Sequence, residues 1–408
     1  MGVDRGTGGM VRGSGGRLDG AGLTALFLVA ICGAYGAIIV SILPSLVGSW
    51  VSDVGLTEQA AGEVAAANVF GATLGLAAAL FLVSSWPLPR IARLGLLLAM
   101  TGDALSIWAG GFAELSILRA VAGLGVGLFT GAIINWIGRH EQAARGFGMY
   151  TMLQFVLAAG YIAAVPAVSL YTGGASIYIC LLALAALSFL LAPLLALNGG
   201  NVPLVQMPSD VKDAAARSGP LLKFLSVLAF GLFSIAAVGL WSYMLRYGEI
   251  LGIEPGEVAN ILALSALCGI PGTILVVVLG ARFGRTKPLL FALAVYTVPV
   301  IVFDLAEVTA AIFIGAMVVQ SIAWAVVAPY FQAVQAALDR SGRLAVWGVI
   351  VVSVGAGLGP ALAGFLIDGE SYAIVFAGAT ATLGLAVLAG IAPSLAADRE
   401  ERSAGTSP

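Results

Sequence analysis

The sequence is short of charge and of the side chains on which most enzymes depend. Only 10% of its 408 residues are charged, and it has three cysteines in separate apolar runs and a single histidine, His140. One histidine excludes histidine-based triads and zinc-hydrolase motifs, and no GxxxxGK[ST] phosphate-binding loop is present. A net charge of −2 without a basic tract excludes nucleic-acid binding. We therefore expect a chain that is not an enzyme and that holds no metal or cofactor.

Apolar residues and glycine take the place of charge. Apolar residues make up 60% of the chain, and 54 residues are glycine, whereas soluble domains are only about 45–50% apolar. About 20 apolar residues in a helix cross the core of a bilayer. Twelve such runs, six on each side of a polar gap, predict an all-α membrane protein. They cover 23–46, 58–83, 91–110, 114–137, 147–169, 175–197, 221–245, 257–280, 288–303, 309–337, 344–367 and 372–395.

The basic residues predict the orientation of these runs. Seventeen of the 19 lysines and arginines fall in alternate connections or at the two ends of the chain. Because lysine and arginine concentrate on the cytoplasmic side, we expect both termini in the cytoplasm and the chain in a bacterial inner membrane. The expected divisions are a tail (1–21), a six-helix bundle (22–197), a linker (198–220), a second six-helix bundle (221–396) and a second tail (397–408).

A short repeat relates the two halves. The string GEVA occurs at Gly62–Ala65, in the second run, and again at Gly256–Ala259, at the start of the eighth. Both copies fall at the second helix of a six-helix half. Two halves in the same orientation are typical of transporters that bind a solute at mid-membrane between the halves.

Three glycine-rich motifs lie in or beside the apolar runs. They are Arg119-xxx-Gly123-x-Gly125-x-Gly127 in the fourth run, Gly280-Ala281-Arg282-Phe283-Gly284-Arg285 after the eighth, and Gly355-xxx-Gly359-Pro360-xxx-Gly364 in the eleventh. Together they resemble signatures of the major facilitator superfamily. The loop Ser84–Arg90 lacks the family's strongest signature, and Ala281 stands where its second copy has aspartate. The resemblance implies two pseudo-symmetric six-helix bundles. It also implies a gating or hinge role for Arg282, Gly284, Arg285, Gly359 and Pro360.

Charged side chains inside the apolar runs are costly, and so they point to function. Asp103 lies near the middle of the third run, Arg119 in the outer half of the fourth, and Glu63 near the outer end of the second. One interpretation is proton coupling, in which Asp103 takes up and releases a proton and Arg119 senses its charge. The alternatives are a fixed ion pair, a snorkelling Arg119, and a carboxylate at a cavity mouth for Glu63.

Uncharged polar and aromatic residues at membrane depth predict the lining of a cavity. In the tenth run Gln320, Trp324 and Gln332 share about a third of the helix circumference. The alternative for each residue is a hydrogen bond between helices or a place in an interfacial belt. A cavity with few fixed charges suits a small, partly apolar organic solute or weak acid. The full set is Asn68, Asn135, Trp136, Gln154, Tyr243, Gln320, Trp324 and Gln332.

These features predict a monomeric secondary transporter that moves a small organic solute across the lipid bilayer by alternating access. Protons are the expected coupling ion, and efflux is favoured over uptake. The alternatives are proton-coupled uptake of an aromatic or carboxylic acid and a non-transporting membrane scaffold or receptor with the same fold.

Overall fold

The described part of the chain is almost entirely α-helical. The computed structural model describes residues 20–138, 143–196, 219–280, 282–339, 343–367, 369 and 371–405. Most of the expected N-terminal tail and linker therefore lies outside the described residues. The first half forms α1 (Gly20–Ala37), α2 (Leu43–Ser52), α3 (Glu58–Leu82), α4 (Leu88–Ser106), α5 (Phe112–Gly138), α6 (Ala143–Thr172), η1 (Gly173–Ala175), α7 (Ser176–Leu191) and η2 (Ala192–Ala196). The second half forms α8 (Pro220–Ile250), α9 (Pro255–Leu267), α10 (Gly269–Leu279), α11 (Thr286–Leu305), α12 (Ala310–Leu338), α13 (Arg343–Leu366) and α14 (Ala373–Gly405).

The helices form six membrane-crossing units in each half, as the sequence predicts. We call each unit a rod, whether it consists of one helix or of two consecutive helices. Within the described ranges, nine stretches are long and apolar enough to cross a membrane, and one of them, Arg145–Leu195, contains both α6 and α7. α4 is a continuous helix, but it is not among the nine because it contains three charged residues, Arg90, Arg93 and Asp103. The remaining rod consists of α1 and α2, and α9 and α10 likewise form one rod.

In each half, a glycine in a turn connects the first rod to the second. Gly55 (φ 76°) precedes α3, and Gly252 (φ 80°) precedes α9, and glycine adopts this left-handed backbone without a steric cost. The Thr57 hydroxyl then caps α3 by accepting a hydrogen bond from the Ala60 amide at 3.2 Å. We call the end of the bundle that holds these two turns the outer end, following the orientation expected from the basic residues, and the opposite end the inner end.

The first rod is broken, which corrects the expectation of one helix over 23–46. α1 ends at Ala37, and α2 begins only at Leu43. Pro44 has no N–H with which to bond the Val40 carbonyl, and that carbonyl accepts instead from the Leu43 amide at 3.4 Å. Residues 38–42 consequently form a turn in the middle of the protein.

Two other boundaries differ from the sequence prediction. The run 257–280 is interrupted at Cys268, between α9 and α10, because Pro271 cannot continue the helical ladder. α14 continues to Gly405, ten residues past the end expected for the last run.

Glycines allow pairs of rods to pack closely. A Cβ atom on Gly71 or Gly75 of α3 would overlap backbone carbonyl oxygens of α5, and one on Gly123 or Gly127 of α5 would overlap those of α3. The spacing of four residues places these glycines on one face of each helix. The α8–α13 pair is built in the same way, with Gly239, Gly355 and Gly359.

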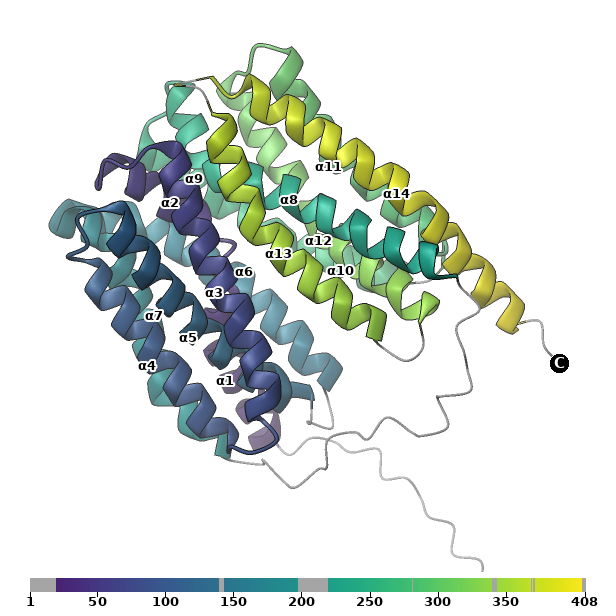
Figure 1. Ribbon diagram of the computed structural model, residues 1–408, viewed down its shortest axis with the longest axis horizontal. Coiled ribbons are helices and arrows are strands. Elements are labelled where there is room, and N and C mark those ends of the chain that lie inside the picture. Colours follow the sequence, from purple (N-terminus) through teal and green to yellow (C-terminus); the bar gives the residue numbers. More distant parts are fainter. Residues whose placement is uncertain are drawn as a thin grey trace, which may run out of the picture.

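The two halves lie side by side, with α1–α7 in one group and α8–α14 in the other (Figure 1). The groups meet where α3 packs against α13, α2 against α8, and α6 against α9. The candidate site lies between them.

Candidate functional site

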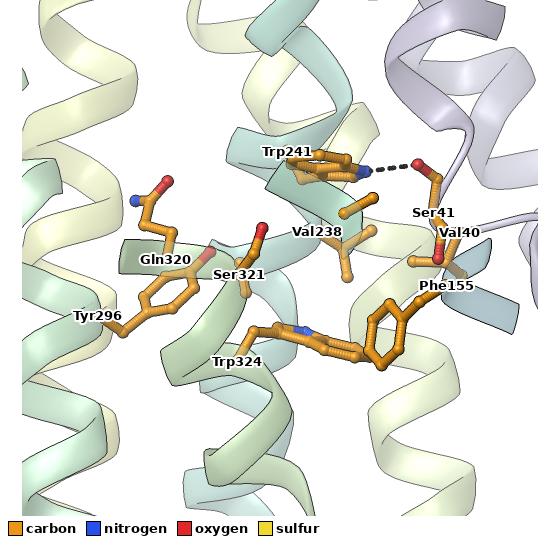
Figure 2. Close-up of a pocket in the computed structure, with 11 residues that line it drawn as sticks. Val40, Ser41, Phe155, Val238, Trp241, Tyr296, Gln320, Ser321 and Trp324 are labelled. Atoms are coloured by element: carbon orange, nitrogen blue, oxygen red, sulfur yellow. Dashed lines mark hydrogen bonds between the residues drawn. The ribbon is translucent and has the colours of Figure 1, made fainter. Parts of the chain in front are cut away.

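A cavity lies between the halves. In Figure 2 Trp241, Gln320 and Trp324 of the C-terminal half lie across from Ser41 and Phe155 of the N-terminal half. The lining comes from the α1–α2 turn and from α6, α8, α9, α11 and α12. It consists of Val40, Ser41, Phe155, Ala237, Val238, Trp241, Ala266, Tyr296, Gln320, Ser321 and Trp324.

A second cavity adjoins the first and shares Val40, Val238 and Trp324 with it. Its other lining residues come from α1, α3, α5, α6, α8, α12 and α13, and Gln154 is among them. None of the described residues that line either cavity is charged. The two cavities can therefore hold a solute by hydrogen bonds, aromatic contact and apolar packing, without a fixed ionic partner.

The broken first rod supplies a polar group to the cavity. The Trp241 indole N–H donates to the backbone carbonyl oxygen of Ser41 at 2.9 Å (Figure 2). In a continuous helix this carbonyl would accept from the Ser45 amide. In the turn over 38–42 the Ser45 amide donates to the Ile42 carbonyl, and the Ser41 carbonyl is left for Trp241. The Gln154 amide donates to the Ser41 hydroxyl at 3.4 Å. Helices from both halves thus meet at one residue of the turn.

Aromatic rings form part of the cavity wall. Phe155 of α6 and Trp324 of α12 make an edge-to-face contact, with ring centroids 6.3 Å apart. Tyr296 and Gln320 are buried nearby in the lining. Such a wall favours a solute with an apolar or aromatic part, because rings stack and pack without requiring a charge.

The eight residues predicted to line a cavity divide into two groups. Gln320 lines the first cavity, Gln154 lines the second, and Trp324 lines both. The other five lie elsewhere: Asn68 and Trp136 are buried among helices, Asn135 is half-buried, Gln332 is exposed, and Tyr243 joins the two halves at the outer end. Their part in solute binding stays a prediction.

Sequence reasoning missed Ser41, Trp241, Tyr296 and Ser321. Serine, tryptophan and tyrosine are common in apolar runs, and nothing in the sequence distinguishes these four from structural residues. Pro44 is visible in the first run, but a proline there indicates only that the helix can break, not which residue reaches the cavity.

The outer end is closed by contacts between the halves. The Tyr243 hydroxyl of α8 lies 2.7 Å from the Glu58 carbonyl oxygen of α3 and 3.1 Å from the Pro360 carbonyl oxygen of α13, and is placed to donate to either. Arg246 pairs with the carboxylates of Glu58, at 3.5 Å, and Glu249. Helix α3 also approaches α13 so closely that a Cβ on Gly62 would overlap the Pro360 carbonyl.

Asp103 and Arg119 form a buried ion pair between α4 and α5. Arg119 Nη2 donates to Asp103 Oδ1 at 2.7 Å and to the Ser106 hydroxyl at 3.0 Å. The side chains of Arg119 and Asp103 are 0% and 3% exposed. The Arg119 guanidinium also lies 5.1 Å from the centre of the Tyr178 ring, a cation–π geometry.

The pair connects to the first rod and does not line the cavities. The Trp50 indole N–H of α2 donates to the Tyr178 hydroxyl at 2.9 Å. Neither Asp103 nor Arg119 is among the described lining residues. Glu63 lies apart from the pair, half-buried on α3, and accepts a hydrogen bond from Gln59 at 3.0 Å.

The predicted gating residues lie in two places. Gly284 has φ 73° in the loop before α11, and Asp398 of α14 accepts hydrogen bonds from the Arg285 and Thr286 amides at 2.7 and 3.1 Å. Arg282 is exposed in the same loop. Gly359 and Pro360 lie in α13 at the contact with α8, where Gly359 packs against Gly239. Whether these residues gate stays a prediction.

The structure is similar to those of several solved transporters. It matches a bacterial homologue of the human lysosomal transporter Spinster, in an inward-facing and unoccupied conformation, with a TM-score of 0.70 and 17% identity over 95% of this chain and 99% of that one. A peptide transporter gives a TM-score of 0.70 and 16% identity over 93% and 95% of the two chains. A D-xylose–proton symporter gives 0.65 and 16% over 92% and 95%. No family model matches the sequence, and no curated protein matches it significantly.

At these identities the likeness shows the fold. The chain has the fold of the major facilitator superfamily, two six-helix bundles packed side by side, and the fold class predicted from the sequence is confirmed. With its nine apolar stretches, this fold makes the chain a multi-pass membrane protein.

Proposed function

We propose that this chain is a secondary transporter that moves a small, partly apolar organic solute across a membrane by alternating access. The observation that carries the proposal is an uncharged cavity between the two halves, closed at the outer end by contacts of Tyr243 and Arg246 with Glu58. Opening these contacts while the inner end closes would carry a bound solute from one side to the other.

The lining supports a neutral or weakly acidic solute. Amide and hydroxyl groups from Gln154, Gln320 and Ser321 offer hydrogen bonds, and Phe155 and Trp324 offer a flat apolar wall. A multiply charged phosphate would lose its hydration without gaining an ionic partner. We propose export as the direction, with both termini in the cytoplasm of a bacterium and the monomer as the working unit.

Proton coupling is proposed for the Asp103–Arg119 pair. Because the pair is separate from the cavities, its effect on the solute must pass through the helices. Protonation of Asp103 would remove the counter-charge of Arg119 and weaken the 2.7 Å contact. Arg119 in turn contacts Tyr178, whose hydroxyl is bonded to Trp50 of α2. Since α2 packs against α8 of the other half, this chain of contacts leads from the pair to the outer closure.

The coupling is tested by transport into everted vesicles with and without an imposed proton gradient. A thermal-shift screen of small organic compounds on the purified protein first identifies a ligand. Asp103→Asn, which keeps the shape and cannot ionise, is expected to reduce gradient-driven accumulation at least tenfold while the ligand still binds. Asp304→Asn, at the outer end of α11, is the matched control and should transport normally.

The outcomes separate the levels of the proposal. If Asp103→Asn accumulates the ligand as well as the wild type does, the proton role is wrong but transport stands. If the wild type binds ligands but moves none of them in either vesicle orientation, the chain acts as a receptor or scaffold and the transport proposal fails.

A further inference from the structure

A groove on the C-terminal half is separate from the two cavities of the proposed transport cycle. It lies between α10, α11, α12 and the loop that joins α10 to α11. Its lining is apolar except for Lys287. Three of the lining side chains, Leu275, Phe283 and Phe291, are 42%, 59% and 72% exposed. Leu275 and Phe291 lie on membrane-crossing helices, where side chains left so open face lipid.

The groove has the length of one leaflet. Along α11 it extends from Lys287 to Val295, and eight residues at 1.5 Å each span about 12 Å. The hydrocarbon core of a bilayer is about 30 Å thick, so one leaflet contributes about 15 Å. An acyl chain lying along α11 would therefore be accommodated over most of its leaflet.

Positive charge gathers at one end of the groove. Lys287 lies in the first turn of α11, which has no acidic residue, and Arg282 precedes it in the loop. A cation at a helix N-terminus is unfavourable because the positive end of the helix dipole lies there. In the part of the chain that the structure describes, neither Lys287 nor Arg282 forms an ion pair.

One carboxylate lies near this end of the groove. Both oxygens of Asp398 accept hydrogen bonds, from the amides of Arg285 and Thr286 and from the Thr286 hydroxyl, at 2.7 to 3.1 Å. In the described part of the chain Asp398 forms no ion pair with Lys287 or Arg282. Its single negative charge is outnumbered by the positive charges of Lys287 and Arg282, so the end of the groove carries an excess of positive charge beside an apolar surface.

We propose that this groove is a binding site for one anionic phospholipid. One acyl chain lies along α11 between Phe283 and Val295, and the headgroup phosphate lies at Lys287 and Arg282. Basic pockets where transmembrane helices reach the membrane surface bind acidic headgroups in this manner. The groove is separate from the two cavities between the halves, because none of its residues lines them, and Arg282 at its end is also one of the predicted gating residues.

The proposal is tested by native mass spectrometry of the full-length protein in a neutral detergent. The probes are phosphatidylglycerol and phosphatidylcholine with identical acyl chains. We expect phosphatidylglycerol to bind at least fivefold more tightly, since one lysine near an anionic surface contributes about that factor. Lys287→Gln should reduce the preference to twofold or less. Lys223→Gln removes the same charge from α8, outside the groove, and should retain the full preference.

Two further arms separate a lipid from other anions. Val295→Trp fills the groove and should weaken phosphatidylglycerol binding at least fivefold with Lys287 still present. Inorganic phosphate, tested in place of the lipid, should not compete at equal concentration. Equal binding of the two lipids, an equal loss in both lysine variants, or full competition by phosphate would each overturn the proposal.

Discussion

Arg119 is a fully buried cation with an incomplete set of hydrogen bonds. Its Nη2 donates to Asp103 and Ser106, whereas Nε and Nη1 have no hydrogen-bond partner among the described residues. A buried charge is tolerated when it is paired and is very costly when it is not. The stability of this region therefore depends on Asp103 and Arg119 being present together.

A double-mutant comparison tests this dependence. Arg119→Gln leaves the Asp103 carboxylate buried without a partner and is expected to cost about 3–5 kcal/mol, seen as a clear fall in the melting temperature of the purified protein. Adding Asp103→Asn should recover a large part of that loss, because no isolated charge then remains. A double variant as unstable as the sum of both single variants would show that the pair is not coupled.

The sequence predicts some of these residues better than others. Asp103 and Arg119 stand out because charge in an apolar run is rare, and their pairing follows from the packing of α4 on α5. Tyr243 was expected to line the cavity, and the structure places Trp241 in the lining and Tyr243 against Glu58 and Pro360 at the outer end. Residues two positions apart on a helix point about 200° apart, and the sequence does not say which of the two faces the cavity.

Among the helices, proline illustrates how far sequence reasoning reaches. Pro44 and Pro271 interrupt rods, whereas Pro166, Pro299 and Pro329 lie inside continuous helices. The position of a proline is visible in the sequence. Whether the helix continues past it depends on neighbouring groups that satisfy the freed carbonyl, and these come from other helices. The twelve rods were therefore predictable, but the turn that brings Ser41 to the cavity was not.

The α3–α5 contact yields a prediction for single glycines. Gly123→Ala would place a Cβ against the Asn68 carbonyl oxygen, and because backbone cannot move aside cheaply, we expect a fall of several degrees in melting temperature. Gly160→Ala on α6 is the matched control, since its Cβ would meet nothing within 4 Å.

The control variant should be as stable as the wild type or slightly more so, because alanine is favoured over glycine in a helix by about 1 kcal/mol. If both variants melt at the wild-type temperature, close glycine packing does not hold α3 and α5 together.

At the scale of the whole molecule, the two halves are joined at the outer end by a small number of specific contacts. Tyr243 and Arg246 of α8 reach Glu58 of α3 there, and the Trp241–Ser41 bond joins the halves deeper in the protein, at the cavity. A closure made of few polar contacts and close glycine packing can separate without unfolding either half. This is the property that alternating access requires.

A reversible crosslink across this closure tests the central claim most directly. A Cβ on Gly48 would lie 3.9 Å from the Leu245 Cβ, within the 3.5–4.5 Å range of disulfides. The experiment combines Gly48→Cys with Leu245→Cys in a background where the three native cysteines, Cys32, Cys180 and Cys268, are replaced by alanine. Each single variant in that background serves as a control for the oxidant.

Transport of the identified ligand is then measured in vesicles before oxidation, after oxidation and after reduction. Alternating access predicts that the crosslinked protein transports nothing, that reduction restores transport, and that the single variants are unaffected. Transport at the uncrosslinked rate by protein shown by mass spectrometry to be fully crosslinked would contradict the account.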